Sequence, residues 1–595
     1  MAKPASWFLR AVVGRVGVLG KAMSEMILGI DLGTTNSVVG VMESGFPLLL
    51  ADDSGSRLTP SAVWYGPNGE KEVGERALRR RGMGGVVTSV KRLIGSSQEV
   101  AGRSPEEVSS EILKQLVRVA SNRLEKEVTK AVVTVPAYFN ESQRGATMRA
   151  GELAGLEVVR LLSEPTAAAL AYGLEKLGDE KTVVVYDLGG GTFDVSVLKL
   201  RKGQFEVLAT AGDTRLGGDD FDKAILQGVG FDVDAAHSSL VVERALAEAQ
   251  RVKVALSSQD EVSFRLPFLE GDSDVEGISE LVVRSDFEKW ITPYLQKTER
   301  YCCQALADAG VATEEVEAVV AAGGSTHVPA VKSFIAKLFE REVEDGVDPD
   351  EVVARGAVIQ AGIISGAIRE VVLLDVTPLS LGLETIGGLM NVVIPRNTTI
   401  PCRAGEMFTN AVSGQAAMKI RVLQGERELA RDNWELGEVE VPFGSEAKGQ
   451  ARVGVQFALD ANGLLEILAR DTKTGEDRIL RIESAAIDVA DVKVEQMVSD
   501  SVEHAFSDLN ARIFHESKLK AEEMLEALEM AMGLIGGELE GQNLEEVRNC
   551  EREVRRLLKS SEEDGAAFKA AVVQLDQATE ELAALLVTQA IGEES

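Results

Sequence analysis

The sequence predicts a multidomain protein in which an α/β domain is followed by a β-sandwich and a C-terminal α-helical segment. Three observations predict this order. A chain of 595 residues exceeds the size of a single hydrophobic core, which rarely grows beyond about 250–300 residues. As far as about residue 369, apolar strands alternate with helical patterns, as in α/β folds. The apolar period then becomes two, for example at Met418, Ile420 and Val422, and it becomes helical from about residue 490.

The first element is a basic extension, residues 1–25, which we expect to lie outside the fold. It carries four basic side chains and no acid before Glu25, and its apolar stretches are short and interrupted by glycine. A transit-like presequence that targets an organelle is one interpretation. The interpretation that we favour is a dispensable extension, with the true start at Met23 or Met26.

The α/β domain, residues 26–369, contains one motif twice. The copies read IDLGTTNSV from Ile30 and YDLGGGTFDV from Tyr186, and each lies between two apolar runs. Both copies predict a strand, a Gly-rich turn and a second strand. In each, an aspartate, Asp31 or Asp187, ends the first strand.

Two such hairpins facing each other would hold a triphosphate and its metal ion. Glycine lets backbone N–H groups approach phosphate closely, and Thr34, Thr35 and Thr192 supply hydroxyl donors. The two aspartates are hard oxygen ligands of the kind that Mg²⁺ prefers. One Asp-Leu-Gly turn would be an ordinary tight hairpin, but two copies with matching flanks favour a nucleotide site. The chain has no G-x-x-x-x-G-K-[ST] loop, so the site is of another kind.

A third segment could complete this site. It reads VVAAGGST from Val319 and precedes an amphipathic helical pattern. Its Gly-Gly turn could receive a nucleoside, although a plain connection between a strand and a helix also explains it. Further along, residues 370–378 form an apolar linker, which is unusual because connections are normally polar. From the residues alone, this linker is an edge strand.

Bulk composition excludes several functions. A net charge of −32 argues against nucleic acid and anionic membranes as partners, and it suits a cytoplasmic protein. The four cysteines form no C-x-x-C pair and the four histidines are scattered, which argues against a metal centre built on them. No apolar run reaches the length of about 18 residues that spans a membrane.

With these motifs together, the chain resembles the DnaK-type chaperones, the heat-shock protein 70 family. Further matching stretches follow the family's order from about Ile27 to the C-terminal helices: VKRLIG from Val90, VPAYFN from Val135, EPTAAA from Glu164, LGGDDFD from Leu216, VLLDVTPLSLG from Val372 and NTTIP from Asn397. The resemblance implies an actin-like nucleotide-binding domain at residues 26–369, an interdomain linker at 370–378, a β-sandwich substrate-binding domain at 379–488 and a helical lid at 489–595. It also implies that ATP hydrolysis drives the binding and release of hydrophobic peptide segments.

The resemblance assigns roles in an ATPase site. Lys91 would position the attacking water. Asp31, Glu164 and Asp187 would hold Mg²⁺ through water, and Asp194 would orient water or K⁺. The implied catalytic set is Lys91, Glu164, Asp187, Thr192 and Asp194. The residues implied to contact ATP or ADP are Asp31, Gly33, Thr34, Thr35, Asn36, Gly189, Gly190, Gly191, Thr192, Lys253, Ser257, Gly323, Gly324 and Ser325.

Two departures from the family pattern fall on the nucleoside side. His327 stands where an arginine usually follows the Gly-Gly-Ser-Thr turn and lies along the adenine. Gln250 replaces a glutamate that is usual near the ribose. Both departures put tight retention of ADP in doubt, without affecting the expectation of ATP binding.

Communication between the domains would use positions that also match the family. They are Pro136, Arg144, Arg160, Leu373, Leu374 and Asp375. The first two match an interdomain switch, and the two leucines belong to a linker that docks on the nucleotide domain in one nucleotide state. Arg160 and Asp375 match positions used by J-domain co-chaperones, although Ser163 replaces a usual asparagine beside them.

The peptide site would be an apolar slot for one extended, Leu-rich segment, with backbone hydrogen bonds adding affinity without sequence choice. Its implied lining is Leu383, Ile386, Phe408, Ala411, Met418 and Ile420. Met418 replaces a smaller β-branched residue, which predicts a pliable pocket floor.

The partners are less defined. Residues 96–108 and 222–253 are short compared with the family, so the need for an exchange factor is uncertain. Several stretches, such as VIPRN from Val393, resemble the HscA branch, which serves an iron–sulfur scaffold protein. A general DnaK chaperone and an ATPase-poor holdase are the alternatives. A non-chaperone actin-like ATPase is disfavoured, because it would not need the sequence beyond about residue 370.

Overall fold

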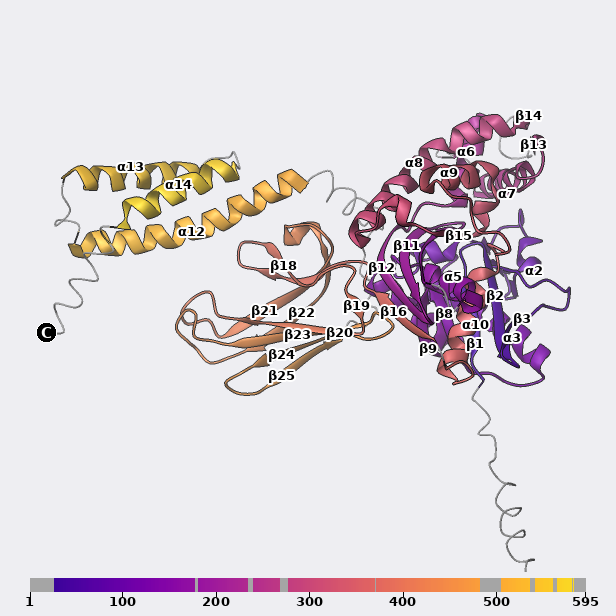
Figure 1. Ribbon diagram of the computed structural model, residues 1–595, viewed down its shortest axis with the longest axis horizontal. Coiled ribbons are helices and arrows are strands. Elements are labelled where there is room, and N and C mark those ends of the chain that lie inside the picture. Colours follow the sequence, from indigo (N-terminus) through magenta and orange to yellow (C-terminus); the bar gives the residue numbers. More distant parts are fainter. Residues whose placement is uncertain are drawn as a thin grey trace, which may run out of the picture.

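The computed structural model describes residues 26–176, 180–233, 239–267, 277–369, 371–481, 505–535, 541–559, 564–580 and 582 (Figure 1). The expected basic extension, residues 1–25, and the expected junction between sandwich and lid, at residue 488, lie outside the described residues. Figure 1 shows an α/β domain, then a β-sandwich, then the C-terminal helices labelled α12, α13 and α14. The predicted multidomain fold is confirmed. None of the described helices is long and apolar enough to span a bilayer.

The first half of the α/β domain is built on one sheet. Its strand order is β3 (Phe46–Leu49), β2 (Asn36–Glu43), β1 (Leu28–Leu32), β8 (Lys130–Val135) and β9 (Glu157–Ser163), with β4 (Thr59–Pro60) paired to β2. Strand β1 pairs antiparallel with β2 and parallel with β8. Along β1 only Asp31 is not fully buried, so the strand delivers this carboxylate to an open edge.

The second half repeats this arrangement in a second sheet. Its order is β15 (Ala318–Ala322), β10 (Glu180–Leu188), β11 (Phe193–Arg201), β12 (Gln204–Asp213), β16 (Val372–Val376) and β19 (Thr399–Ile400). Strand β10 pairs antiparallel with β11 and parallel with β15, as β1 does with β2 and β8. The apolar run of β10 is buried from Val183 to Leu188, as expected for a strand covered on both faces.

Two helices join the halves: α5 (Glu164–Gly173) packs on β10 and β11, and α10 (Val352–Ile364) packs on β1 and β2. They cross at Gly356, where an added Cβ would lie 1.8 Å from the carbonyl oxygen of Ala167. The absence of a side chain at Gly356 therefore lets the two halves approach to backbone contact.

The other elements of the domain surround the sheets. Helix α3 (Pro105–Leu124) begins with a capping box, in which the Ser104 hydroxyl accepts from Glu107 N at 3.2 Å, followed by proline at the first helical position. The remaining elements are β5 (Val63–Tyr65), β6 (Lys71–Val73), α2 (Glu75–Leu78), β7 (Val86–Val87), η1 (Val90–Leu93), α4 (Glu141–Leu153), η2 (Leu174–Lys176), α6 (Gly218–Gly228), α7 (Ser239–Leu256), β13 (Glu261–Leu266), β14 (Ile278–Val283), α8 (Arg284–Ala309), η3 (Thr313–Glu315), η4 (Gly324–His327) and α9 (Pro329–Phe339).

The sandwich has two four-stranded sheets. One has the order β18 (Leu389–Ile394), β17 (Leu381–Thr385), β21 (Ala417–Gln424) and β22 (Trp434–Pro442), with η5 (Ala430–Asp432) before β22. The other has the order β20 (Cys402–Phe408), β23 (Val453–Leu459), β24 (Leu465–Asp471) and β25 (Asp477–Arg481). Every second residue of β23 is buried, so the period of two places one face of the strand in the core.

The C-terminal helices are α12 (Ala505–Ile535), α13 (Gly541–Leu558) and α14 (Gly565–Ala578). They form a core in which the rings of Phe514 and Phe568 lie 5.2 Å apart. Two ion pairs attach α12 to the sandwich. Arg512 binds Glu428 at 2.6 Å, and Glu523 binds Lys448 at 2.8 Å.

The apolar linker is strand β16. It pairs parallel with β12, where Leu373 lies opposite Phe205, and antiparallel with β19, where Asp375 lies opposite Ile400. The linker is therefore an edge strand of the α/β sheet and at the same time a segment docked on that domain. Residue 370 lies outside the described part of the chain.

Candidate nucleotide site and peptide slot

A cavity of about 570 Å³ opens between the two Gly-rich hairpins. Most of its wall comes from the ends of strands β1 and β10 with their hairpin turns, and from the turn after β15. The structure places these predicted residues on it: Asp31, Gly33, Thr34, Thr35, Asn36, Lys91, Glu164, Asp187, Gly189, Gly190, Thr192, Lys253, Ser257, Gly323, Gly324 and Ser325. Gly191 and Asp194 do not line it; Asp194 is buried opposite Asp187 in the β10–β11 ladder.

The two hairpins touch each other at their turns. A Cβ added to Gly190 would lie 2.0 Å from the hydroxyl oxygen of Thr35, so only glycine allows this contact. Gly323 has a φ of +81°, and its Cβ would lie 2.4 Å from the carbonyl oxygen of Leu188. The glycines therefore join three turns around one cavity, and the absence of side chains there lets a phosphate approach the backbone closely.

Three carboxylates, Asp31, Glu164 and Asp187, line the floor of the cavity, and a fourth, Asp194, is buried beside Asp187. Burial, followed by the charge of Glu164, raises the pKa of Asp31 to about 6 and that of Asp194 to about 8. Burial, with the charges of Glu164, Asp194 and Asp31 adding to it, also raises the pKa of Asp187. Thr134 donates its hydroxyl proton to Asp31 Oδ1 at 2.7 Å, which fixes the orientation of that side chain.

Lys91 lies beside these carboxylates on the wall of the cavity. It forms a buried ion pair with Glu164. Lys91 and Arg144, whose charge also reaches Asp194, do not balance four acids, and Asp194 Oδ2 has no protein hydrogen-bond partner among the described residues. This excess of buried oxygen ligands fits a hydrated divalent cation such as Mg²⁺ at Asp31, Glu164 and Asp187.

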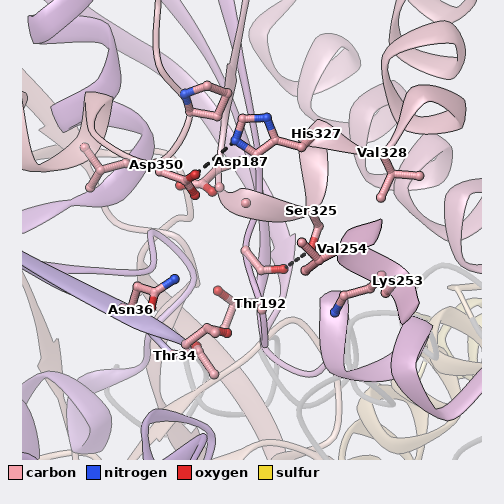
Figure 2. A pocket seen from close by; sticks show the side chains of 18 of the residues that line it. Thr34, Asn36, Asp187, Thr192, Lys253, Val254, Ser325, His327, Val328 and Asp350 are labelled. Carbon is pink, nitrogen blue, oxygen red and sulfur yellow. Dashed lines mark hydrogen bonds and ion pairs between the residues drawn. The ribbon is translucent and has the colours of Figure 1, made fainter. Parts of the chain in front are cut away.

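The nucleoside side is held by contacts within the protein. Lys253 Nζ binds Asp222 at 2.9 Å and donates to the carbonyl oxygen of Gly218 at 2.7 Å. Ser325 donates to the carbonyl oxygen of Gly189 at 2.7 Å, which ties the third turn to the second hairpin. His327 Nε2 lies 3.0 Å from Asp350 Oδ2 at the edge of the cavity (Figure 2). Gln250 also lines the cavity and accepts from Arg81 at 3.3 Å.

Some lining residues were missed by sequence reasoning. Asp350 and Pro349 come from the loop before α10, and Val254 comes from α7 beside the predicted Lys253. Another missed residue, Arg92, donates to the carbonyl oxygen of Gly191 at 3.0 Å and so braces the second hairpin. The sequence signal that could have identified Arg92 is its position directly after Lys91 in the chain.

The six predicted slot residues line a second cavity, of about 730 Å³, in the sandwich. They are Leu383, Ile386, Phe408, Ala411, Met418 and Ile420. Charged side chains also line it: Arg421 pairs with Glu384, and with Glu435 at 2.6 Å, and Lys419 pairs with Glu438 at 3.1 Å. A cavity lined by apolar side chains, and by charged ones that are paired with each other, can take an extended apolar segment.

The predicted coupling residues lie where the two domains meet. Arg144 is buried beside Pro136; it donates to the carbonyl oxygens of Phe139 and Ala137 at 3.1 Å each and to that of Asn462, in the sandwich, at 3.2 Å.

Two more of the predicted positions lie at this contact. Arg160 donates to the carbonyl oxygen of Ala461 at 3.2 Å. Asp375 accepts from Ser163 at 3.0 Å, and its burial raises its pKa. The serine that replaces the family's asparagine thus holds the linker carboxylate.

Comparison with known proteins identifies the family. A profile of the Hsp70 protein family matches residues 27–103 and 97–588. The chain belongs to the Hsp70 family. It is 40% identical over 584 residues to the chaperone protein DnaK of Mycoplasmopsis pulmonis, an alignment that covers 96% of this chain and 97% of the relative. It is also 40% identical over 567 residues to the chaperone protein DnaK of Mycoplasma mycoides subsp. mycoides SC, covering 93% and 95%.

Family membership confirms the resemblance seen in the sequence. Hsp70 chaperones are ATPases that use ATP, ADP and Mg²⁺, and the chain is an ATPase of this class. DnaK-type chaperones bind peptide segments of client proteins and J-domain co-chaperones. Both relatives are described as DnaK chaperones, so the comparisons support the general chaperone and give no support to the HscA specialisation.

Proposed function

We propose that this Hsp70 chain is an ATP-driven chaperone in which hydrolysis in the first cavity controls peptide binding in the sandwich slot. The division into a nucleotide domain (26–369), linker (370–378), sandwich (379–488) and lid (489–595) is part of this proposal. The observation that carries it is strand β16. The linker pairs with the start of β12, in the second sheet of the nucleotide domain, and with β19, whose Ile400 packs in the hydrophobic core of the sandwich.

In the hydrolysis step, we assign positioning and charge neutralisation to the chain's own residues, because phosphoryl transfer needs little else from a protein. Thr34, Thr35 and Thr192 would donate to phosphate oxygens. Lys91 would position the attacking water, and its ion pair with Glu164 supports this by fixing the ammonium at the cavity floor. Bound Mg²⁺ would neutralise phosphate charge from its place among the buried carboxylates.

Asp194 would accept a hydrogen bond from the attacking water, or bind K⁺. The orphaned oxygen atom Oδ2 of this carboxylate supports either role. Tyr138 N donates to the other oxygen, Oδ1, at 3.1 Å, which leaves Oδ2 as the free acceptor.

Peptide would bind to the apolar side chains of the slot, while the charged side chains that line it stay paired with their partners. A J-domain co-chaperone would act at Arg160 and Asp375, which both lie at the contact between the domains. The iron–sulfur scaffold as client would rest only on the sequence stretches that resemble HscA, and we propose the general role instead. The cytoplasmic location and the need for an exchange factor stay predictions.

Single-turnover ATP hydrolysis, with and without a Leu-rich peptide and J-domain proteins, tests the proposal. We expect peptide and one J-domain protein each to accelerate hydrolysis. A Met418→Trp variant should lose stimulation by peptide because its ring fills the slot. Ile479→Trp, on an exposed position of β25 outside the slot, is the matched control. ATP binding without hydrolysis or stimulation would refute the cycle and indicate a holdase.

A further inference from the structure

The turn of the second Gly-rich hairpin is held by hydrogen bonds to its carbonyl groups. The carbonyl oxygens of Gly189 and Gly190 accept from backbone N–H groups at the start of helix α6, at 3.0 and 2.7 Å. The carbonyl oxygen of Gly191 accepts from a side chain instead, Arg92 Nε, at 3.0 Å. Three consecutive peptide groups of this turn are therefore fixed, and the third depends on Arg92.

The guanidinium of Arg92 also binds helix α6. Its Nη2 donates to Asp220 Oδ2 at 2.7 Å, and the same oxygen accepts from Gly217 N at 2.9 Å. Both side chains are mostly buried, with 15% of Arg92 and 14% of Asp220 exposed. Burial lowers the pKa of Arg92, but the carboxylates of Asp219, Asp220 and Asp213 outweigh burial and raise it. Arg92 thus holds two acceptors at once, which suits the rigid fork of a guanidinium and not the single ammonium of lysine.

Arg92 connects the two halves of the nucleotide domain. It lies on η1, in the first half, directly after Lys91, which lines the cavity. Both of its acceptors belong to the second half. A Cβ added to Gly191 would lie 2.7 Å from Arg92 Nε, so the turn and the guanidinium are in close contact. The short element η1 therefore presents Lys91 to the cavity and Arg92 to the turn, which ties the place of the ammonium to that of the second hairpin.

We propose that Arg92 is a positioning residue of the ATPase, which keeps the turn of the second hairpin aligned with Lys91. The proposal rests on the ATP-driven function proposed above. In a trans peptide group the N–H points opposite to the carbonyl, so the hydrogen bond to Gly191 directs the N–H of Thr192 away from Arg92. Thr192 lines the cavity near Thr34, and Arg92 does not line it (Figure 2). Arg92 thereby aims this donor at the phosphates without touching them.

Single-turnover hydrolysis by the full-length protein with Mg²⁺, in excess over ATP, tests this beside the dissociation constants of ATP and ADP. Because Arg92 lies outside the cavity, Arg92→Gln should change either dissociation constant by less than about 3-fold. Its hydrolysis rate should fall roughly 10- to 100-fold, the loss that a displacement of about 1 Å produces. Arg92→Lys, which keeps the charge and lacks the fork, should fall less. Arg118→Gln, exposed on α3, is the control and should hydrolyse at the unchanged rate.

Asp220→Asn supplies the second measurement. It removes the charge that Arg92 binds, while its side-chain oxygen can still accept from Gly217 N. We expect it to slow hydrolysis alone and to add little in Arg92→Gln, because both changes act on one contact.

Three results would overturn the inference: an unchanged rate in Arg92→Gln, effects that multiply in the double variant, or a loss of ATP affinity as large as the loss of rate. The last would indicate a purely structural role for Arg92. Absence of hydrolysis in the unchanged protein would instead refute the ATP-driven function, and with it this inference.

Discussion

Replacing Glu141 by glutamine should hold the nucleotide domain and the sandwich together more strongly at neutral pH. Glu141 begins helix α4 and is only 4% exposed at the contact between the domains. Its Oε2 accepts from Leu465 N of the sandwich at 3.1 Å. Burial raises the pKa of this carboxyl from 4.5 to about 8, against the opposing effects of Arg144 and that hydrogen bond.

The sign of the effect follows from proton uptake. When the domains separate, the carboxyl returns to water and to its ordinary pKa, so the docked state binds the proton more tightly. Docking is therefore strongest below pH 4.5, weakens as the pH rises and levels off above about pH 8. At pH 7, docking of the two domains is weaker than below pH 4.5 by about 3 kcal/mol, or roughly a hundredfold in the docking equilibrium. Glutamine in place of Glu141 removes this loss of docking free energy, and its side-chain oxygen still accepts the hydrogen bond from Leu465 N.

Hydrogen exchange of the β16 amides, corrected for the intrinsic exchange rate at each pH, measures docking directly. Between pH 6 and 8.5 we expect protection to fall in the unchanged protein and to stay constant in Glu141→Gln. Glu152→Gln, on an exposed position of the same helix, is the control and should follow the unchanged protein. Equal pH slopes for Glu141→Gln and the unchanged protein would refute the reasoning.

Lys91→Ala should lower single-turnover ATP hydrolysis by about 10²–10³-fold while ATP still binds, because the charge that faces the developing phosphate is lost; an unchanged rate would remove Lys91 from the mechanism. Gly190→Ala should abolish ATP binding in calorimetry, since its methyl group would lie 2.0 Å from Thr35 Oγ1; Gly533→Ala, with nothing within 4 Å, should bind normally. Phe568→Ala should destabilise the C-terminal helices by about 3–5 kcal/mol, seen as an earlier loss of helical circular dichroism on heating. A chelator that removes Mg²⁺ should reduce hydrolysis to background, and hydrolysis that persists would contradict the carboxylate cluster as the metal site.

Local signals explain what the sequence could predict. Each Gly-rich hairpin is a short stretch whose residue types directly specify a strand, a turn and a second strand, so Asp31 and Asp187 could be placed at strand ends. The alternation at Met418 and Ile420 likewise predicted a sheet with one buried face. These patterns depend on neighbours a few residues away, and the structure brings the hairpins together as two similar halves of one domain.

What the sequence could not predict depends on packing between distant segments. Asp350 reaches the cavity because its loop is fixed by a hydrogen bond from Gly323 N to the carbonyl oxygen of Pro349, at 3.0 Å. Glu141 meets Leu465 only because the sandwich docks, and nothing around either residue signals this contact. The role of the linker could not be predicted from its sequence either, because an edge strand and a docking segment have the same apolar pattern.

Strand β16 has one further consequence, for cooperativity. It has five residues: the first three pair with β12 of the nucleotide domain, and the last two pair with β19, whose Ile400 lies in the core of the sandwich. A backbone ladder this short has no stable half-formed state, because a strand is held only when its neighbours on the ladder are also held. The contact that β16 makes between the domains should therefore form or break as a whole. Small changes in free energy at either cavity would then switch the linker between a fully paired and a fully unpaired state.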